Sequence, residues 1–525
     1  MYYIRVVYPL LAIAIASLIL RGYLRRRRIN PAGLPLPPGP PRLPIVGNLF
    51  GIKDLGSQWL TFAEWGKTYG DFIYLEILGT RILVLNSEKV AQDLLDKRSQ
   101  NYSDRPQVPM VTLMGWEFNV GFIPYGASWR KHRKAMHHAL NQQAMVSYRD
   151  IQRAKVQQFA RNLIEVPEEM ERHIRTFTAS TIMTVVYGYE MAPRDDLFAS
   201  IADRASEMLT NSFFPGAALV NAFPLLQHLP EWCPGAGFKK FARECRKLTR
   251  ELRDKPYAFV QKQMADGIAP HSMVSEMLER HEEEVVIKSV AGTTYAAAVE
   301  TSSSALSAFV MAMIMFPSVQ KKAQAEIDQI TGGTRLPDFT DRPSMIYLEA
   351  TYREVLRWCQ VTPLGVPHMT TDHDVYEGFF IPKGEFIGFD QLVVFLHMLI
   401  DTIVLANIWA MTHNEEKYPD PMKFMPERYI AADGSLTDDI AEQQFGFGRR
   451  ICIGKYLAEA SVWIAMVTML AVFNINKAKD ENGRNIDIMP EFTPGVIIHP
   501  KPYPFWISAR SPHSVGLVQN KDVQA

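Results

Sequence analysis

The sequence predicts one large, mainly helical domain behind an N-terminal membrane anchor. A chain of 525 residues with 47% hydrophobic content can bury a large core, and no long low-complexity linker or internal repeat divides it. Lys+Arg and Asp+Glu both total 56, so the chain lacks the global basic field typical of nucleic-acid-binding proteins. A nucleic-acid partner is therefore disfavoured.

The N-terminal segment predicts a single transmembrane helix over residues 1–24. Val6–Leu20 is apolar, and the basic block Arg25–Arg28 follows it. The apolar run spans only about 22 Å against a hydrocarbon core of roughly 30 Å, but Tyr2–Ile4 and a snorkelling Arg21 extend it. A cleaved signal peptide would carry its charges before the apolar run. By the positive-inside rule the rest of the chain is expected in the cytosol.

A basic, proline-rich linker is predicted over residues 25–41. Pro35–Pro41 cannot continue a helix and favours a stiff, extended spacer. We expect the main domain at 42–511 and a C-terminal tail at 512–525.

Cys452 has the surroundings of a metal-bound thiolate. It precedes a predicted helix, Tyr456–Val472, and ends a loop that reads Phe445-Gly446-Phe447-Gly448-Arg449-Arg450-Ile451-Cys452-Ile453-Gly454. A thiolate ligand needs a tight turn, amide donors and a helix N-terminus, and we expect Gly448 and Gly454 to permit the turn. The alternative is a small buried hydrophobic residue, the usual state of a lone intracellular cysteine.

The remaining cysteines, Cys233, Cys245 and Cys359, show no zinc-type spacing. Four cysteines in this length also argue against a disulfide scaffold. We therefore expect the protein to work in a reducing cellular compartment.

Two further helices carry paired polar residues. In Tyr347–Gln360, Glu354 and Arg357 lie three apart on one face, where an exposed ion pair would contribute little to stability. Trp129 and Arg133 lie four apart on another helical face and offer an indole N–H and a guanidinium.

The apolar stretch Val286–Phe316 predicts a long helix. It contains Ala297-Ala298-Val299-Glu300-Thr301-Ser302, in which an acid and an alcohol are adjacent. A threonine in a helix is more often structural, so the adjacent acid is what favours a functional interpretation.

Together these motifs resemble those of the cytochrome P450 family: F-x-x-G-x-R-x-C-x-G, E-x-x-R, W-x-x-x-R and A-G-x-D/E-T-T, with an arginine loop at Pro426–Tyr429. The resemblance extends from Pro35 to about Ser511 and is greatest to fungal microsomal members that include the O-methylsterigmatocystin oxidoreductases. It implies a mainly α fold with small β-sheets in a single haem-binding domain. Ala298 and Ser302 depart from the family pattern, which has Gly and Thr there.

The resemblance also implies residue roles. Cys452 would be the axial ligand of haem b iron, and Glu300 and Thr301 would deliver protons and hold oxygen. The predicted cofactor-binding residues are Trp129, Arg133, His368, Arg450, Phe445 and Gly448. The predicted structural triad is Glu354, Arg357 and Arg428.

The implied function is a haem-thiolate monooxygenase that uses O2 and NADPH electrons. The chain has no flavin module, so the electrons would come from a separate NADPH–cytochrome P450 reductase at the endoplasmic reticulum membrane. A basic docking patch is expected from Arg130, Lys131, Lys134, Arg449 and Lys455.

Apolar segments predict a lipophilic substrate such as a polycyclic, terpenoid or polyketide-like compound. The residues expected at the substrate cavity are Met110, Met114, Trp116 and Phe118; Phe213-Phe214-Pro215 and Phe223-Pro224-Leu225-Leu226; and Phe492-Thr493-Pro494-Gly495-Val496. Large hydrophobic stretches also build ordinary cores, so each residue alone is weak evidence.

Residues 385–401 form an unusual apolar insertion between Gly384 and Thr402, where the related fungal sequences run straight on. Their coding length of 51 nucleotides is in frame, and Gly384-Glu385-Phe386 can be encoded with a splice-donor-like GTGAGT. We hypothesise a retained intron; the alternative is a genuine insertion, which we expect to displace a strand lining the substrate cavity.

Two other functions stay open from the sequence. One is an O2-independent haem-thiolate isomerase or dehydratase, against which Glu300-Thr301 argues. The other is a non-catalytic haem-binding relic, favoured only if the 385–401 insertion is real and disruptive.

Overall fold

The computed structural model describes residues 27–44, 46–54, 56–212, 219–233, 235–383 and 402–519. The predicted anchor at 1–24, the segment Phe213-Phe214-Pro215 and the insertion at 385–401 lie outside the described residues.

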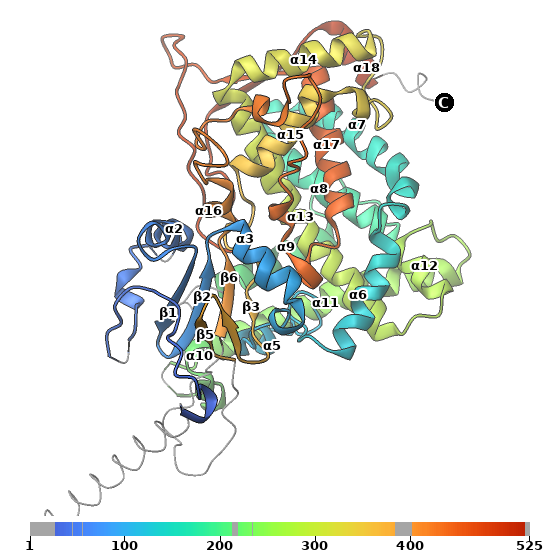
Figure 1. Ribbon diagram of the computed structural model, residues 1–525. Helices are drawn as coiled ribbons and strands as arrows, with labels where there is room; N and C mark the ends of the chain where they lie inside the picture. The colour runs from blue at the N-terminus through green and yellow to red at the C-terminus, as the bar shows by residue number, and fades with distance from the viewer. Residues whose placement is uncertain are drawn as a thin grey trace, which may run out of the picture.

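The described chain is mainly helical, with small sheets at one side (Figure 1). The longer helices are α2 (Gln58–Tyr69), α6 (Ala127–Leu140), α7 (Arg149–Glu165), α8 (Met170–Tyr187), α9 (Leu197–Ser212), α11 (Gly237–Ala265), α13 (Glu284–Met315), α14 (Pro317–Thr331), α15 (Ile346–Trp358) and α17 (Lys455–Val472). Shorter helices are α3 (Glu88–Ala91), α4 (Ser99–Tyr102), α5 (Pro109–Leu113), α10 (Leu219–Ala222), α12 (Met273–Glu279), α16 (Ile408–Thr412) and α18 (Pro512–Gln519). The predicted fold class, mainly α with small β-sheets, is confirmed.

The long helix α13 crosses the middle of the molecule (Figure 1). It is apolar around most of its circumference and is covered by neighbours that include α8 and α17. Among the described residues, α13 and α17 are both long and apolar enough to span a membrane, but most of each is buried inside the protein. They are core helices, and the helices predicted at Val286–Phe316 and Tyr456–Val472 are confirmed within two residues at each end.

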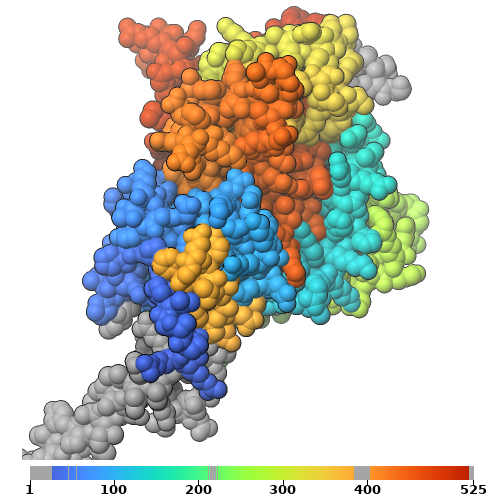
Figure 2. All heavy atoms as spheres, viewed as in Figure 1, coloured from blue at the N-terminus to red at the C-terminus, as the bar shows by residue number. Residues whose placement is uncertain are grey.

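A four-stranded sheet combines segments far apart in the chain. Its order is β1 (Phe72–Ile77), β2 (Thr80–Leu85), β6 (Thr402–Ala406) and β3 (His368–Met369). β1 and β2 are antiparallel, β2 and β6 are parallel, and β6 and β3 are antiparallel. Figure 2 shows residues 40–110, in blue, and the orange segment after residue 402 meeting on one face of the molecule.

Two antiparallel pairs complete the strands. β4 (Asp374–Tyr376) pairs with β5 (Phe379–Ile381), and β7 (Phe473–Lys477) pairs with β8 (Phe505–Ala509).

Strand β6 begins at Thr402, directly after the inserted segment, and keeps its place between β2 and β3. The expectation that a genuine insertion would displace a strand is therefore wrong. Thr370 holds the two flanks together: its N–H donates to the Thr402 carbonyl at 3.2 Å, and its hydroxyl donates to the Pro382 carbonyl at 3.2 Å. The flanks of the insertion meet at one buried residue.

The proline-rich segment is docked on the sheet and does not stand away from the body as a spacer. The Pro38 carbonyl accepts the Tyr74 N–H at 2.9 Å, and the Pro35 carbonyl accepts the Phe380 N–H at 2.8 Å. Gly39 is needed because a Cβ there would overlap the carbonyl oxygen of Tyr74. The segment is extended, as predicted, but two of its backbone carbonyls accept hydrogen bonds from strands β1 and β5.

The C-terminal residues that we assigned to a tail continue the domain as far as Gln519. Helix α18 packs on α7 and α17 and buries Val518. Arg161 on α7 donates to the carbonyl of Val518 at 3.1 Å, which fixes the end of the helix.

Candidate active site

Two adjoining cavities of about 190 and 310 Å³ lie between α13 and the loop that carries Cys452. Both are lined by Arg105, Ala297, Thr301, Arg450 and Cys452. The sequence motifs around Thr301 and Cys452, 151 residues apart in the numbering, therefore face a common space.

The Cys452 loop presents the thiol to that space. The Cys452 N–H donates to the Phe445 carbonyl at 2.7 Å and closes the loop. The exposed surface of Cys452 faces the cavity, and the surrounding protein buries the residue on its other sides. Burial raises the pKa of the Cys452 thiol above its usual value, while the Gly454 amide and the Arg133 guanidinium act in the opposite direction.

Two glycines give the loop its turn. Gly446 and Gly448 have φ of +76° and +59°, in the left-handed region. At Gly448 a Cβ would also overlap the carbonyl oxygen of Leu95, whereas the space beside Gly446 is open. Gly454 has φ of −83°, so the expectation that it permits the turn is wrong. The backbone amide of Gly454 instead donates a hydrogen bond to the Cys452 sulfur.

Arg450 is anchored by backbone carbonyls at the rim of both cavities. Its Nε donates to Ser103 O and one terminal nitrogen donates to Ile123 O, each at 2.8 Å. Its guanidinium lies 4.4 Å from the ring centroid of Trp129, and the Arg133 guanidinium lies 6.0 Å from the same centroid. Trp129 and Arg133 also line the smaller cavity. The structure thus brings these three predicted cofactor-binding residues together.

His368 lines the larger cavity and is buried at the start of β3. Its Nδ1 faces the carbonyl of Tyr102 at 2.7 Å, which calls for a proton on Nδ1. Burial, together with the positive charges of Arg105 and Arg450, holds the pKa of His368 well below its usual value. The imidazole is neutral at physiological pH.

Arg105 belongs to the same cluster and was missed in the sequence analysis. It is 5% exposed, and its guanidinium donates to the carbonyls of Gly121, Val366 and Pro367. Burial and repulsion from Arg450 lower its pKa to about 9. Its neighbours in sequence form no motif, so only the fold reveals it.

The cavities fit a large, flat anionic cofactor with a soft metal. Arg105, Arg133 and Arg450 bring positive charge to the rim. The hydrogen bonds of Arg105 and Arg450 described above go to neutral carbonyls, so two carboxylates would offset charge at this rim. Cys452 would supply a thiolate ligand, and Phe445 lines the larger cavity with it. This donor set matches haem with two propionates.

Thr301 and Glu300 point in different directions. Thr301 lines both cavities and donates its hydroxyl to the Ala297 carbonyl at 2.8 Å. Glu300 lines neither cavity; it is ion-paired with Arg175 at 2.5 Å and with His499 at 3.2 Å. These hydrogen bonds and positive charges outweigh the effect of burial and lower the pKa of Glu300 to about 2.

The predicted structural triad is assembled and buried. Arg357 donates two hydrogen bonds to Glu354, at 2.7 and 2.9 Å, and both side chains are fully buried. Arg428 approaches the same carboxylate at 3.2 Å. The pair was expected on sequence grounds to contribute little if exposed, and its burial changes that expectation.

The apolar residues predicted at the substrate cavity belong mostly to the core. Met110, Met114 and Trp116 are buried in a cluster with α11 and α13, and Phe118 packs on Gly292. Phe223 and Leu225 are exposed. None of these described residues, nor the segment from Phe492 to Val496, lines either cavity. The apolar walls come from other residues: Val120, Met136, Leu140, Ile182, Val361, Val366, Ala406 and Ile408.

Comparison with known proteins agrees with this site. The family model for cytochrome P450 matches residues 37–506. The chain is 36% identical to cytochrome P450 monooxygenase COX1 of Coprinopsis cinerea, over 97% of this chain and 98% of that protein. It is 38% identical to cytochrome P450 monooxygenase 208 of Postia placenta, over 92% of each chain. It is also 36% identical to tryptamine 4-monooxygenase of Psilocybe cyanescens, over 94% of this chain and 96% of that protein.

The fold and the thiol-bearing cavity define a haem-thiolate oxidoreductase. The chain belongs to the cytochrome P450 family, and its relatives are fungal monooxygenases. Its cofactor is haem with a thiolate ligand, and its electrons come from a redox partner. The predicted family, enzyme class and cofactor are thus confirmed.

Proposed function

We propose that this chain inserts one oxygen atom of O2 into a lipophilic secondary metabolite or xenobiotic, with Cys452 as the thiolate that would hold haem iron. The observation that carries the proposal is the shared space between Cys452 and Thr301, walled by apolar side chains and rimmed by cations. Bound haem supplies the oxygen activation, and the electron-rich thiolate favours O–O cleavage.

The residues around the cavity divide the remaining work. Arg450, Arg133 and Arg105, with Trp129, are placed to bind the propionates by charge and N–H donation. His368, neutral and donating to Tyr102, keeps its other ring nitrogen as an acceptor or water partner at the same rim.

Thr301 is the hydroxyl placed to hold a proton at the cavity. Its hydroxyl hydrogen is donated to the Ala297 carbonyl, and the hydroxyl oxygen can also accept a hydrogen bond. Ser302 lies beside it in both cavities, so the departure from the family's second threonine keeps a hydroxyl there. Glu300 would act through Thr301 as the acid of the pair.

The substrate class follows from the cavity walls. Aliphatic and methionine side chains make up much of the lining of both cavities, and the arginines among the lining residues are Arg105, Arg133 and Arg450. A lipophilic compound can displace water from such walls without leaving polar groups unpaired.

The cellular setting is part of the proposal. We propose a single-pass anchor at residues 1–24 in the endoplasmic reticulum membrane, a catalytic domain from residue 42 in the cytosol, and NADPH–cytochrome P450 reductase as electron donor. The docked segment Pro35–Pro41 supports it, because it would fix the body close to the anchor.

Reconstitution with reductase tests the function. Membranes containing the full chain, reductase, NADPH and a panel of fungal terpenoids and polyketides should yield products heavier by one oxygen. With ¹⁸O2 the added atom should carry the label. Product formation without NADPH and O2 would overturn the proposal and favour an isomerase or dehydratase.

A further inference from the structure

The segment from Phe492 to Tyr503 is tied to one polar face of α13. Ser304 donates its hydroxyl to the Ile498 carbonyl at 2.5 Å, and the Tyr503 hydroxyl donates to the Ser307 carbonyl at 3.0 Å. Glu300, Ser304 and Ser307 follow the spacing of one helical face. The segment therefore has a fixed position beside Glu300.

His499 is held at the point where this segment passes Glu300. Its backbone forms a reciprocal pair with Thr493: the His499 N–H donates to the Thr493 hydroxyl at 2.9 Å, and the Thr493 N–H donates to the His499 carbonyl at 2.8 Å. The imidazole Nε2 then lies 3.2 Å from the Glu300 carboxylate. The His499 side chain is 28% exposed, so it touches solvent and Glu300 together.

The charged groups around this contact come from several elements. Arg175 on α8 bridges Glu300 and Asp203 on α9, at 2.5 and 2.9 Å. Glu171, also on α8, lies close enough for the charge of His499 to lower its pKa, although burial raises that pKa overall. The carboxylates of Glu300 and Glu171 thus lie near His499, and the Arg175 guanidinium contacts Glu300.

We propose that His499 is the solvent-side proton donor to Glu300, and that protons for the reaction enter this chain along His499, Glu300 and Thr301. The inference rests on the proposed monooxygenase function and names the entry point of its proton supply. His499 acts through Glu300 and positions the proton; it does not touch the cavity.

The proposed transfer moves one proton from the His499 imidazolium to the Glu300 carboxylate. The Nε2–H bond of imidazolium breaks and an O–H bond forms on Glu300, leaving a neutral imidazole and a neutral acid. Glu300 lines neither cavity in this structure, so the neutral acid must rotate away from Arg175 and His499 before it passes its proton towards Thr301 and becomes a carboxylate again. A proton from bulk solvent then restores the imidazolium. An imidazole suits this because it changes charge near neutral pH. Glu300 alone is ionised at that pH and carries no proton to give.

The ratio of H2O2 to water formed per NADPH measures how well protons reach the reduced oxygen. One NADPH and one proton convert O2 to H2O2, whereas two NADPH and two protons convert it to two waters. In holoenzyme with reductase, NADPH and O2 but no added substrate, we expect peroxide per NADPH to rise with pH as imidazole loses its proton. In His499→Gln we expect a pH-independent ratio close to one.

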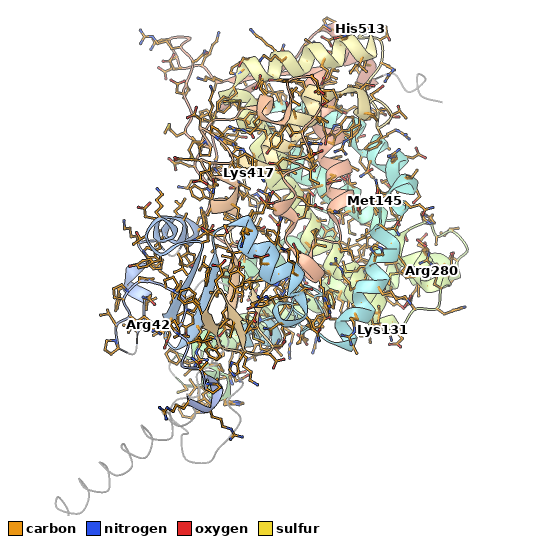
Figure 3. All side chains as sticks on the ribbon, viewed as in Figure 1. Arg42, Lys131, Met145, Arg280, Lys417 and His513 are labelled. Carbon is orange, nitrogen blue, oxygen red and sulfur yellow. The ribbon has the colours of Figure 1, made fainter. Side chains whose placement is uncertain are left out.

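His513→Gln is the matched control, because His513 is a histidine on α18 whose Nε2 contacts the Gly333 carbonyl at 2.8 Å and which lines neither cavity (Figure 3). It should keep the pH profile of the unchanged enzyme. A His499→Gln profile that coincides with that of the unchanged enzyme would overturn the proposal. If the unchanged enzyme oxidised no NADPH, the proposed function itself would fail, and the inference with it.

A double-substitution cycle supplies a readout without turnover. The melting temperatures of the unchanged holoenzyme, His499→Gln, Glu300→Gln and the double variant give the coupling between the two side chains. We expect a coupling at pH 6 that falls severalfold at pH 9, because a charged contact needs the imidazolium. Equal coupling at both pH values would mean a merely structural contact and would contradict the inference.

Discussion

Glu354 and Arg357 form an ion pair in which neither side chain has any exposed surface. Arg428 adds a second cation at the same carboxylate, and the Met425 N–H donates to it at 2.7 Å. Because removal of one partner leaves buried charge without compensation, such pairs are costly to break. The triad therefore ties α15 to the loop before Cys452.

We expect Glu354→Ala to lower the free energy of unfolding by about 3–5 kcal/mol. The control is Glu64→Ala, which removes an exposed pair with Lys67 and should change stability by less than about 1 kcal/mol. Chemical denaturation of both variants measures the difference. Equal losses in the two variants would show that burial of the triad does not matter.

Gly448 and Gly446 differ in what surrounds them although both have positive φ. Gly448→Ala adds overlap with the Leu95 carbonyl to the backbone strain, so we expect loss of haem binding. Gly446→Ala meets open space and should cost only roughly 1–2 kcal/mol. Haem absorbance per mole of purified protein compares the two variants. Full haem content in Gly448→Ala would contradict the assigned role of that close approach.

Several predicted site residues lie around one space in the structure, and these are residues whose chemistry and spacing coincide in the sequence. Cys452, Arg450 and Trp129 could be placed near one another because each lies in a dense motif. Arg105 could not, because its guanidinium reaches the cavity only through carbonyls from distant loops. The orientation of Glu300 depends on Arg175 and His499, which no local pattern connects to it.

At the scale of elements, the positions of the long helices in the sequence were easier to predict than the partners on which the shorter segments pack. The apolar pattern located α13 and α17 well, because long buried helices are apolar on nearly all sides. The proline-rich segment and α18 pack on distant partners, β1 and β5 in one case and α7 and α17 in the other. Their local sequences contain no sign of those partners.

The insertion at 385–401 gives an element-scale prediction. Pro382 and Thr402 both bond to Thr370, so a short connection can join them. A chain lacking residues 385–401 should fold, with a melting temperature at least equal to that of the full chain. A collapse of haem binding on deletion would show that the segment is a genuine part of the domain, and a spliced transcript containing those codons would refute the retained intron.

At the scale of the whole molecule, the predicted reductase patch gathers on the outer side of α6 and the Cys452 loop. Lys131 extends outward from α6 (Figure 3), and it pairs with Glu283, while Lys455 pairs with Glu442. Arg130 and Lys134 are exposed on the same helix and are the better choice for charge reversal. Arg449 and Lys455 lie three residues before and three residues after Cys452 in the chain.

We expect Arg130→Glu with Lys134→Glu to raise the apparent KM for reductase at low ionic strength, and the effect to shrink with added salt. Lys53→Glu with Lys67→Glu makes the same charge change at and just before α2, away from α6 (Figure 1). Steady-state cytochrome reduction with varied reductase measures both. If the two double variants behaved alike, the patch would not be the docking surface.

The reduced, CO-bound absorption spectrum of the full chain, compared with Cys452→Ser, tests the central claim most directly. The unchanged chain should show the red-shifted Soret band of a thiolate ligand, and Cys452→Ser should lose it. Cys359→Ser changes a buried thiol that lines neither cavity and should retain the band. The same red-shifted band in Cys452→Ser would show that another group ligates the iron and would contradict the account.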